Sequence, residues 1–279
     1  MKRHMYPSLL KSYRSTYPFK IASTSFIYPD HIVPNVRLLA SFLDEIELLL
    51  FESRPADSLP SRKVISELRQ LGDDTGLTFN VHLPLDISMG HRDRLLRRQA
   101  VETVQRLVDL TAPLRPSTHT LHLSYDEPSP SSAQVARWQD RLHSSLGHLN
   151  ALGVRGRQLS IENLSYPMEW LENVISCWQL QVCLDVGHLL RQGLAPSALF
   201  DLYHSRLPII HLYGIDRNKD HLALGHLYRR DLDPIMDMLR GYSGIVSLEV
   251  FNYDDLKASL ELLDHCWRGR GGEAAPSRP

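Results

Sequence analysis

Cysteine and net charge are both scarce in this sequence, and each scarcity excludes a class of protein. Neither the odd number of cysteines nor their spacing fits a disulfide framework or a cysteine-ligated metal site. The formal net charge is −1, so the chain has no overall positive field to attract nucleic acid or an anionic membrane. We therefore expect neither of these as a partner, and we expect the cysteines to fill space in a reduced interior. They are Cys177, Cys183 and Cys266.

Long hydrophobic runs are also missing. No apolar stretch approaches the roughly 18 residues that span a membrane, and the basic N-terminus lacks the apolar core of a secretory signal. These absences predict a cytoplasmic protein. Residues 268–279 combine glycine, proline and charge without apolar periodicity, which predicts a disordered C-terminal tail. We expect residues 1–267 to form one domain, with an N-terminal extension at 1–18.

The chain does contain eight short segments rich in β-branched and aliphatic residues, each bounded by polar or turn residues. Segments with helical periodicity lie between them. Pro196 and Pro234 stand where helices would begin, and Gly72 and Gly76 where one would end. The eight predicted strands start at Phe19, Asp44, Leu77, Thr118, Arg157, Leu180, Pro208 and Gly244.

This alternation of strand and helix requires parallel strands joined by helical crossovers. Eight nearly continuous apolar strands predict an α/β fold, a single (β/α)₈ TIM barrel, for which about 250 residues suffice. The alternative is a doubly wound open sheet, which would place a glycine-rich phosphate turn after the first strand. The corresponding stretch, STSFIYPD at 23–30, contains no glycine, and this favours the barrel.

Imidazole and carboxylate side chains recur near the C-terminal ends of six consecutive predicted strands. In a barrel that end is the catalytic face, so residues far apart in sequence meet there. Taken singly, a strand histidine is often a hydrogen-bonded core group, and a strand-end carboxylate often caps the next helix. Taken together, their desolvation would be costly unless cations offset it. The six are His82, His122, Glu162, Asp185, His211 and Glu249, and His188 and His221 extend the set.

Mixed imidazole and carboxylate donors suit zinc, manganese, iron or cobalt, whereas magnesium or calcium alone would favour oxygen ligands. We predict two or three divalent ions as cofactors, with zinc or manganese foremost. Ions about 3.5 to 4 Å apart need a bridging carboxylate, and Glu162 is the best-placed candidate. After the seventh strand His221 is the favoured ligand and Asp220 a weaker one, since either could instead cap the following turn.

The order His, His, Glu, Asp-x-x-His, His, Asp-His and Glu resembles the xylose isomerase-like barrel superfamily, which includes endonuclease IV-type apurinic nucleases and sugar isomerases and epimerases. Lys219 stands where the nuclease pattern has an aspartate, so the third ion of that pattern is the least supported. The resemblance implies a first ion at His82, His122 and Glu162, a second at Glu162, Asp185, His211 and Glu249, and a third at His188, His221 and Asp220.

The N-terminal third resembles one branch of this superfamily more closely. The stretch TSFIYPDHIVPNVRLLASFLDEIELLLFES, followed by FNVHLPLD, is similar to the cobamide remodelling phosphodiesterases (CbiR). This resemblance implies hydrolysis of the phosphoester that joins the nucleotide-loop phosphate of a cobamide to the ribose of its lower ligand. The products would be cobinamide phosphate and an α-riboside. A corrinoid of the cobalamin type would then be a substrate and not a bound cofactor.

Clustered metal ions suit this chemistry because they activate water, hold a phosphodiester oxygen and neutralise the departing oxygen. In this hypothesis Glu162, Glu249 and His188 are catalytic as well as metal ligands. Arg217 or Lys219 would hold the phosphate. Side chains at predicted strand ends would line a pocket for a large planar ligand. These are Tyr28 and Tyr125, together with Pro29, Phe51 and Phe251.

Three other functions stay open at this point. A sugar or sugar-phosphate isomerase or epimerase would use two strand-end glutamates and one metal to move a proton at carbon, without needing His188 or His221. An apurinic endonuclease would carry a basic face and loops that enter the DNA groove, which the near-neutral charge disfavours. A non-catalytic corrinoid carrier gives no reason for eight ligand-type residues at one mouth.

Overall fold

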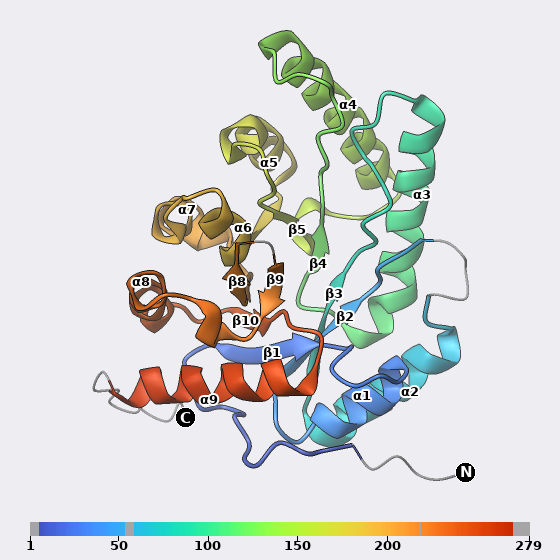
Figure 1. Ribbon diagram of the computed structural model, residues 1–279. Helices are drawn as coiled ribbons and strands as arrows, with labels where there is room; N and C mark the ends of the chain where they lie inside the picture. The colour runs from blue at the N-terminus through green and yellow to red at the C-terminus, as the bar shows by residue number, and fades with distance from the viewer. Residues whose placement is uncertain (1–5, 54–58, 218, 270–279) are drawn as a thin grey trace.

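Eight parallel strands close into a barrel surrounded by helices in the computed structural model, which describes residues 6–53, 59–217 and 219–269 (Figure 1). Around the barrel the strand order is β1-β10-β7-β6-β5-β4-β3-β2, so β10 pairs with β1 and closes the sheet. The predicted (β/α)₈ barrel is confirmed. The barrel strands are β1 (Lys20–Thr24), β2 (Glu45–Leu49), β3 (Thr78–His82), β4 (His119–Leu121), β5 (Leu159–Glu162), β6 (Gln181–Asp185), β7 (Ile209–Leu212) and β10 (Ile245–Leu248).

Helices follow the strands and cover the outside of the barrel (Figure 1). Strands enclosed in this way are buried on both faces, and every residue of β2, β7 and β10 is buried. The α-helices are α1 (Ile32–Leu39), α2 (Arg62–Thr75), α3 (Arg94–Thr111), α4 (Ser132–Ala151), α5 (Glu172–Trp178), α6 (Val186–Arg191), α7 (Pro196–Tyr203), α8 (Arg229–Arg240) and α9 (Tyr253–Gly269). Short 3₁₀ helices are Ala112–Leu114, Gly156–Gln158, Met168–Leu171, His204–Arg206 and Leu224–His226.

Two of the four predicted helix boundaries are correct. Helix α7 begins at Pro196, and α2 ends before Gly76, whose φ of 72° lies in the left-handed region that favours glycine. Gly72 instead lies inside α2, where an added Cβ would come within 2.9 Å of the Leu77 carbonyl oxygen. Pro234 lies inside α8, because the helix already begins at Arg229. Close packing, not helix termination, therefore accounts for Gly72.

The described part of the N-terminal extension packs against the N-terminal ends of β2 and β3. The amide of Tyr13 donates to the carbonyl of Phe42 at 2.9 Å. The guanidinium of Arg14 donates to the carbonyls of Ala40 and Thr75 at 2.9 and 2.8 Å. These contacts tie the extension to the end of the barrel opposite the predicted site. At the other terminus α9 includes residues 268 and 269, and the rest of the predicted tail, 270–279, lies outside the described residues.

A two-stranded antiparallel hairpin, β8 (Gly214–Asp216) and β9 (Lys219–Leu222), is inserted between β7 and α8. It carries part of the predicted site toward the mouth of the barrel. Cys183 and Cys266 are buried as expected, whereas Cys177 is exposed on α5 and does not fill the interior. Within the described residues, no helix combines the length and apolar character that crossing a membrane requires.

Candidate metal centre

The donors predicted from the sequence meet at the C-terminal mouth of the barrel. His82, Glu162 and Asp185 are the last residues of β3, β5 and β6. His211 lies in β7 and is the register partner of Asp185. Glu249 directly follows β10. Parallel pairing therefore aligns these strand ends, although the five residues are scattered from position 82 to position 249.

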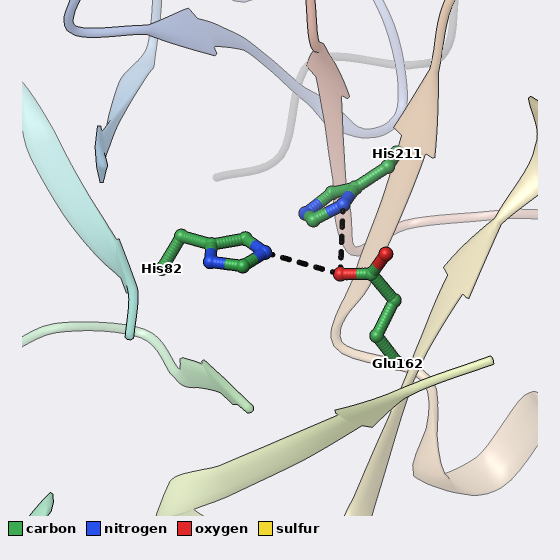
Figure 2. A group of neighbouring side chains, drawn as sticks. All are labelled: His82, Glu162 and His211. Carbon is green, nitrogen blue, oxygen red and sulfur yellow. Dashed lines mark hydrogen bonds and ion pairs between the residues drawn. The ribbon is translucent and has the colours of Figure 1, made fainter. Parts of the chain in front are cut away.

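Glu162 lies at the centre of this group. Its Oε2 atom is 3.1 Å from Nε2 of His82 and 3.5 Å from Nδ1 of His211, and Figure 2 shows both rings turned toward the carboxylate. The same oxygen is 3.0 Å from Nε2 of His122, which follows β4. The other oxygen, Oε1, is 3.4 Å from Nδ1 of His188. One carboxylate thus contacts four imidazoles, which come from the ends of β3 and β4, from β7 and from α6.

Three groups of donor atoms lie close enough to hold a metal ion. In each group the atoms are within 4.8 Å of one another. Neighbouring groups share members, so their ions would be neighbours bridged by common side chains. The groups are His82, Glu162 and His211; Glu162, Asp185 and His188; and Asp185, His211 and Glu249.

Backbone carbonyls orient three of the histidines. Nδ1 of His82 lies 2.9 Å from the carbonyl oxygen of Leu83, and Nδ1 of His188 lies 2.9 Å from that of Asn163. Nδ1 of His221 lies 3.0 Å from the carbonyl oxygen of Glu249. Because a carbonyl only accepts, Nδ1 is the donor in each ring and Nε2 is the nitrogen left for a metal ion. A hydrogen bond of this kind on the opposite nitrogen is typical of histidines that ligate a metal through Nε2.

The sequence analysis did not identify Glu47, which lies behind His211. Its Oε1 atom is 2.9 Å from Nε2 of His211, at ion-pair distance but without hydrogen-bond alignment. Its Oε2 atom accepts a hydrogen bond from Ser247 at 2.5 Å. The available signal was the Glu-Ile-Glu alternation at 45–47, which points two carboxylates to one face of a strand whose other residues are apolar.

Asp185 is held by a second partner that the sequence analysis missed. The hydroxyl of Tyr213 lies 2.9 and 3.1 Å from the two carboxylate oxygens of Asp185. The backbone amide of His188 donates to the same carboxylate at 2.6 Å. At Gly187 an added Cβ would come within 2.2 Å of the Tyr213 ring. The glycine in Asp-Val-Gly-His therefore gives Tyr213 the space to reach Asp185.

The buried carboxylates at the mouth require positive charge beside them. Burial lowers the pKa of His82, but the hydrogen bond and charge of Glu162 outweigh burial and raise that pKa to about 9. Burial raises the pKa of Glu249, but His211 outweighs it and lowers that pKa to about 2. Burial raises the pKa of Asp185 to about 7. Imidazolium protons can supply this charge, as can metal cations, so the two compete for the same site.

The residues present fit a group of divalent cations. Three buried atoms at the mouth lack a hydrogen-bond partner among the described residues, namely Nε2 of His122, Nδ1 of His211 and Oε2 of Glu249. Buried polar atoms without partners are costly, and these are donor types that ligate zinc, manganese and related ions. Nδ1 of His211 and Oε2 of Glu249 lie 3.3 Å apart and their residues share one close donor group, so one cation there could satisfy both atoms.

The hairpin brings only one of its predicted ligands to the mouth. His221 adopts a φ of 54°, and its Nδ1 lies 3.7 Å from Oε2 of Glu249. Asp220 instead forms an ion pair with Arg191, so its position does not support a ligand role. The predicted phosphate-holding residues Arg217 and Lys219 are exposed on this hairpin. Neither Asp220 nor His221 belongs to a group of three close donors within the described chain.

The two tyrosines predicted to bind substrate are engaged elsewhere. Tyr28 is buried, its hydroxyl donates to the carbonyl of Pro7 at 2.8 Å, and its ring packs against that of Tyr253. The hydroxyl of Tyr125 donates to the carbonyl of Ser129 at 2.7 Å, and its ring packs edge-on against Trp138 and Trp170. Both hydroxyls thus stabilise loops, and their positions do not support a substrate contact.

Comparisons with known proteins agree with this architecture. A family model described as xylose isomerase-like TIM barrel matches residues 37–266. A D-tagatose 3-epimerase-like protein superposes with a TM-score of 0.73 at 19% identity, over 90% of this chain and 97% of that one. Endonuclease IV from Thermus thermophilus gives a TM-score of 0.65 at 19% identity, over 90% of this chain and 99% of that one.

The TTHB071 protein, also from Thermus thermophilus and soaked with zinc chloride, gives a TM-score of 0.65 at 22% identity, over 91% of this chain and 99% of that one. Identities this low show that the fold is shared and nothing finer. No curated protein sequence matches the chain significantly.

Proposed function

The chain belongs to the xylose isomerase-like TIM barrel family, and from that premise we propose that it is a metal-dependent phosphodiesterase acting on cobamides. It hydrolyses the phosphoester between the nucleotide-loop phosphate and the ribose of the lower ligand. Water supplies the hydroxyl that joins phosphorus and the proton that the departing ribose oxygen takes. The products are cobinamide phosphate and an α-riboside. The resemblance of residues 24–53 and 79–86 to cobamide remodelling phosphodiesterases supports this choice of substrate.

The position of Glu162 between two sets of donors carries the proposal. Its Oε2 atom lies 3.1 and 3.0 Å from His82 and His122, while the same side chain also groups with Asp185. A single cation would need only one of these sets. Divalent cations held by both would supply Lewis-acid polarisation of the phosphodiester and of the attacking water.

Side chains at the mouth have distinct tasks in this proposal. Glu162 and Glu249 are ligands first, and both are buried. His188 is less buried, and its Nδ1 is held by the carbonyl of Asn163 at 2.9 Å. That contact leaves Nε2 as the nitrogen that exchanges a proton, so we assign His188 as the proton carrier to the departing ribose oxygen, a role that excludes metal ligation through the same nitrogen.

A second candidate function is a one-metal sugar isomerase or epimerase. Asp185, His211 and Glu249 form one close donor group that could hold a single cation, and Glu162 and Glu249 could then move a proton at carbon. The likeness to a D-tagatose 3-epimerase-like fold is compatible with it. His82 and His122 separate the two candidates, because the epimerase reaction gives them no required task.

The purified protein should be incubated with cobalamin and, in turn, zinc, manganese, cobalt and magnesium, while release of the α-riboside is followed by chromatography and mass spectrometry. We expect cleavage with at least one metal, and a loss of at least about 100-fold in kcat/KM in His82→Ala and His122→Ala. His119→Gln, on β4 but outside the mouth, is the matched control. The proposal would give way to the epimerase if the protein cleaved no cobalamin with any of these metals but turned over a ketose, and if His82→Ala kept that ketose activity.

A further inference from the structure

A large apolar cavity opens beside the metal centre, at the C-terminal ends of β1, β2 and β3. Its volume is about 1160 Å³, and described residues from the connections that follow these three strands provide most of its wall. Among these described residues, its polar lining consists of Asp30, His31, Glu52, Ser61 and Asp86. We call this cavity the ring pocket, and its apolar lining includes Phe26, Leu49, Phe51, Leu59, Val64 and Leu85.

A continuous row of rings joins the ring pocket to the metal centre. Phe26 and Phe51 have ring centroids 5.2 Å apart, and Phe51 and Phe251 have centroids 5.9 Å apart. Phe251 in turn lies 5.1 Å from the ring of His221, which contacts Glu249. A ligand whose phosphate is held at the metal centre can therefore extend along this row into the ring pocket.

Two rings of the row and a leucine of the ring pocket are exposed, although hydrogen bonds hold the chain beside them. Phe51 is 41% exposed, Phe251 37% and Leu85 47%. The amide of Leu85 donates to the carbonyl of Phe51 at 3.1 Å. Nearby, the amide and hydroxyl of Ser53 donate to the carboxylate of Asp86 at 2.9 and 2.8 Å. An apolar surface that is exposed, concave and held by hydrogen bonds is typical of a preformed ligand site.

We propose that the ring pocket binds a flat, apolar ring system carried by the phosphodiester substrate. This inference rests on the proposed function and adds a specificity site to it. Aromatic side chains stack on flat rings, whereas a simple sugar or sugar phosphate is too polar and too small to gain from an apolar cavity of this size. In a cobamide the lower base, which leaves with the α-riboside, has this chemistry. The corrin macrocycle, which stays with the phosphate product, is puckered and carries polar amide side chains, so we assign the ring pocket to the lower base.

Binding of the two halves can be measured separately by calorimetry. Phe51→Ala and Phe26→Ala would be titrated with cobinamide and, separately, with the α-riboside of cobalamin. We expect the α-riboside to bind at least about tenfold more weakly to both variants, and cobinamide to bind to them as it does to the wild type. The KM for cobalamin should rise by a similar factor with kcat unchanged, because the substitutions leave the donor set intact. The matched control is Leu152→Ala, which removes an exposed leucine at the C-terminal end of α4.

The possible outcomes separate this inference from the proposed function. If both phenylalanine variants bind the α-riboside as tightly as the wild type does, or if the wild type does not bind it, the ring pocket has been assigned wrongly. If the wild type cleaves cobalamin and both variants bind normally, the proposed function holds and the ring-pocket assignment fails. If the wild type binds the α-riboside in a way that depends on Phe51 but cleaves no cobamide, the ring-pocket assignment holds and the proposed hydrolysis fails.

Discussion

Oε1 of Glu47 lies 2.9 Å from Nε2 of His211, and both side chains are completely buried inside the barrel. The opposite ring nitrogen, Nδ1, lies 3.5 Å from Glu162 and 3.3 Å from Glu249. His211 is therefore held between one carboxylate behind it and two in front of it. A carboxylate behind a metal-ligating histidine orients the ring and increases its basicity, so we expect Glu47 to act as a positioning residue.

Glu47→Gln should lower the affinity for divalent metal by about 10- to 100-fold. The substitution keeps the size of the side chain but removes the charge that faces His211. The measurement is competition with a chromophoric chelator. Glu45→Gln is the matched control, since Glu45 lies on the same strand but accepts hydrogen bonds from Thr78 and Asn80, away from the mouth. Equal affinities in the two variants would show that Glu47 has no such role.

Metal binding should stabilise the fold. A cation present at 100 times its Kd raises the free energy of unfolding by about 2.7 kcal/mol. For a chain of this size that increase corresponds to a rise in Tm of about 5–10 °C. Thermal denaturation with chelator and with each metal would measure the shift, and Glu162→Gln should abolish it. A Tm that none of the four metals changes would argue against a metal centre.

The two hairpin residues should differ in their effect on metal content. His221→Ala should reduce the number of ions bound or their affinity, because His221 contacts Glu249 at the mouth. Asp220→Asn should leave both unchanged, because Asp220 is paired with Arg191. Elemental analysis after dialysis against a weak chelator would measure the stoichiometry. A loss of one ion in Asp220→Asn would restore this residue as a ligand.

His119 should make stability depend on acid pH. Its ring is buried, with its nitrogens 2.9 Å from Thr111 Oγ1 and 3.3 Å from the carbonyl of Gln158, and burial lowers its pKa to about 4. The folded pKa lies below the unfolded value of 6.5, so this contribution is complete above pH 6.5 and is lost as the pH falls toward 4. The full difference is about 3 kcal/mol.

Chemical denaturation of the wild type and of His119→Gln at pH values from 7 to 4 would measure this contribution. The metal ligands titrate in both proteins, so their effect cancels in the difference. We expect the free energy of unfolding of the wild type to fall more steeply than that of the variant. Parallel pH profiles would contradict the assignment.

Much of the candidate site could be predicted because it depends on strand ends. Once hydrophobic segments predict eight parallel strands, the last residue of each strand has a known location, and this prediction brought His82, Glu162 and Asp185 together. Tyr213 and Glu47 were missed because their importance lies in the partner each side chain meets across the barrel. A glutamate within an apolar strand indicates only that some partner exists.

The loop residues also show which features the sequence could predict and which it could not. Asp220 and His221 are adjacent, and the sequence offered little to choose between them. In the hairpin a φ of 54° at His221 turns its ring to the mouth, while Asp220 meets Arg191 from α6. Tyr28 likewise follows a barrel strand, but its hydroxyl bonds to the N-terminal extension, whose path no local pattern predicts.

The sequence by itself determined the barrel and the ring of donors at its mouth, because hydrophobic periodicity and strand order are properties of the chain alone. Only the tertiary structure decided which carboxylate supports His211, which hairpin residue reaches the mouth, and where an apolar cavity adjoins it. Those outcomes depend on contacts between side chains distant in sequence, whose geometry is set by strand register and packing and not by local pattern.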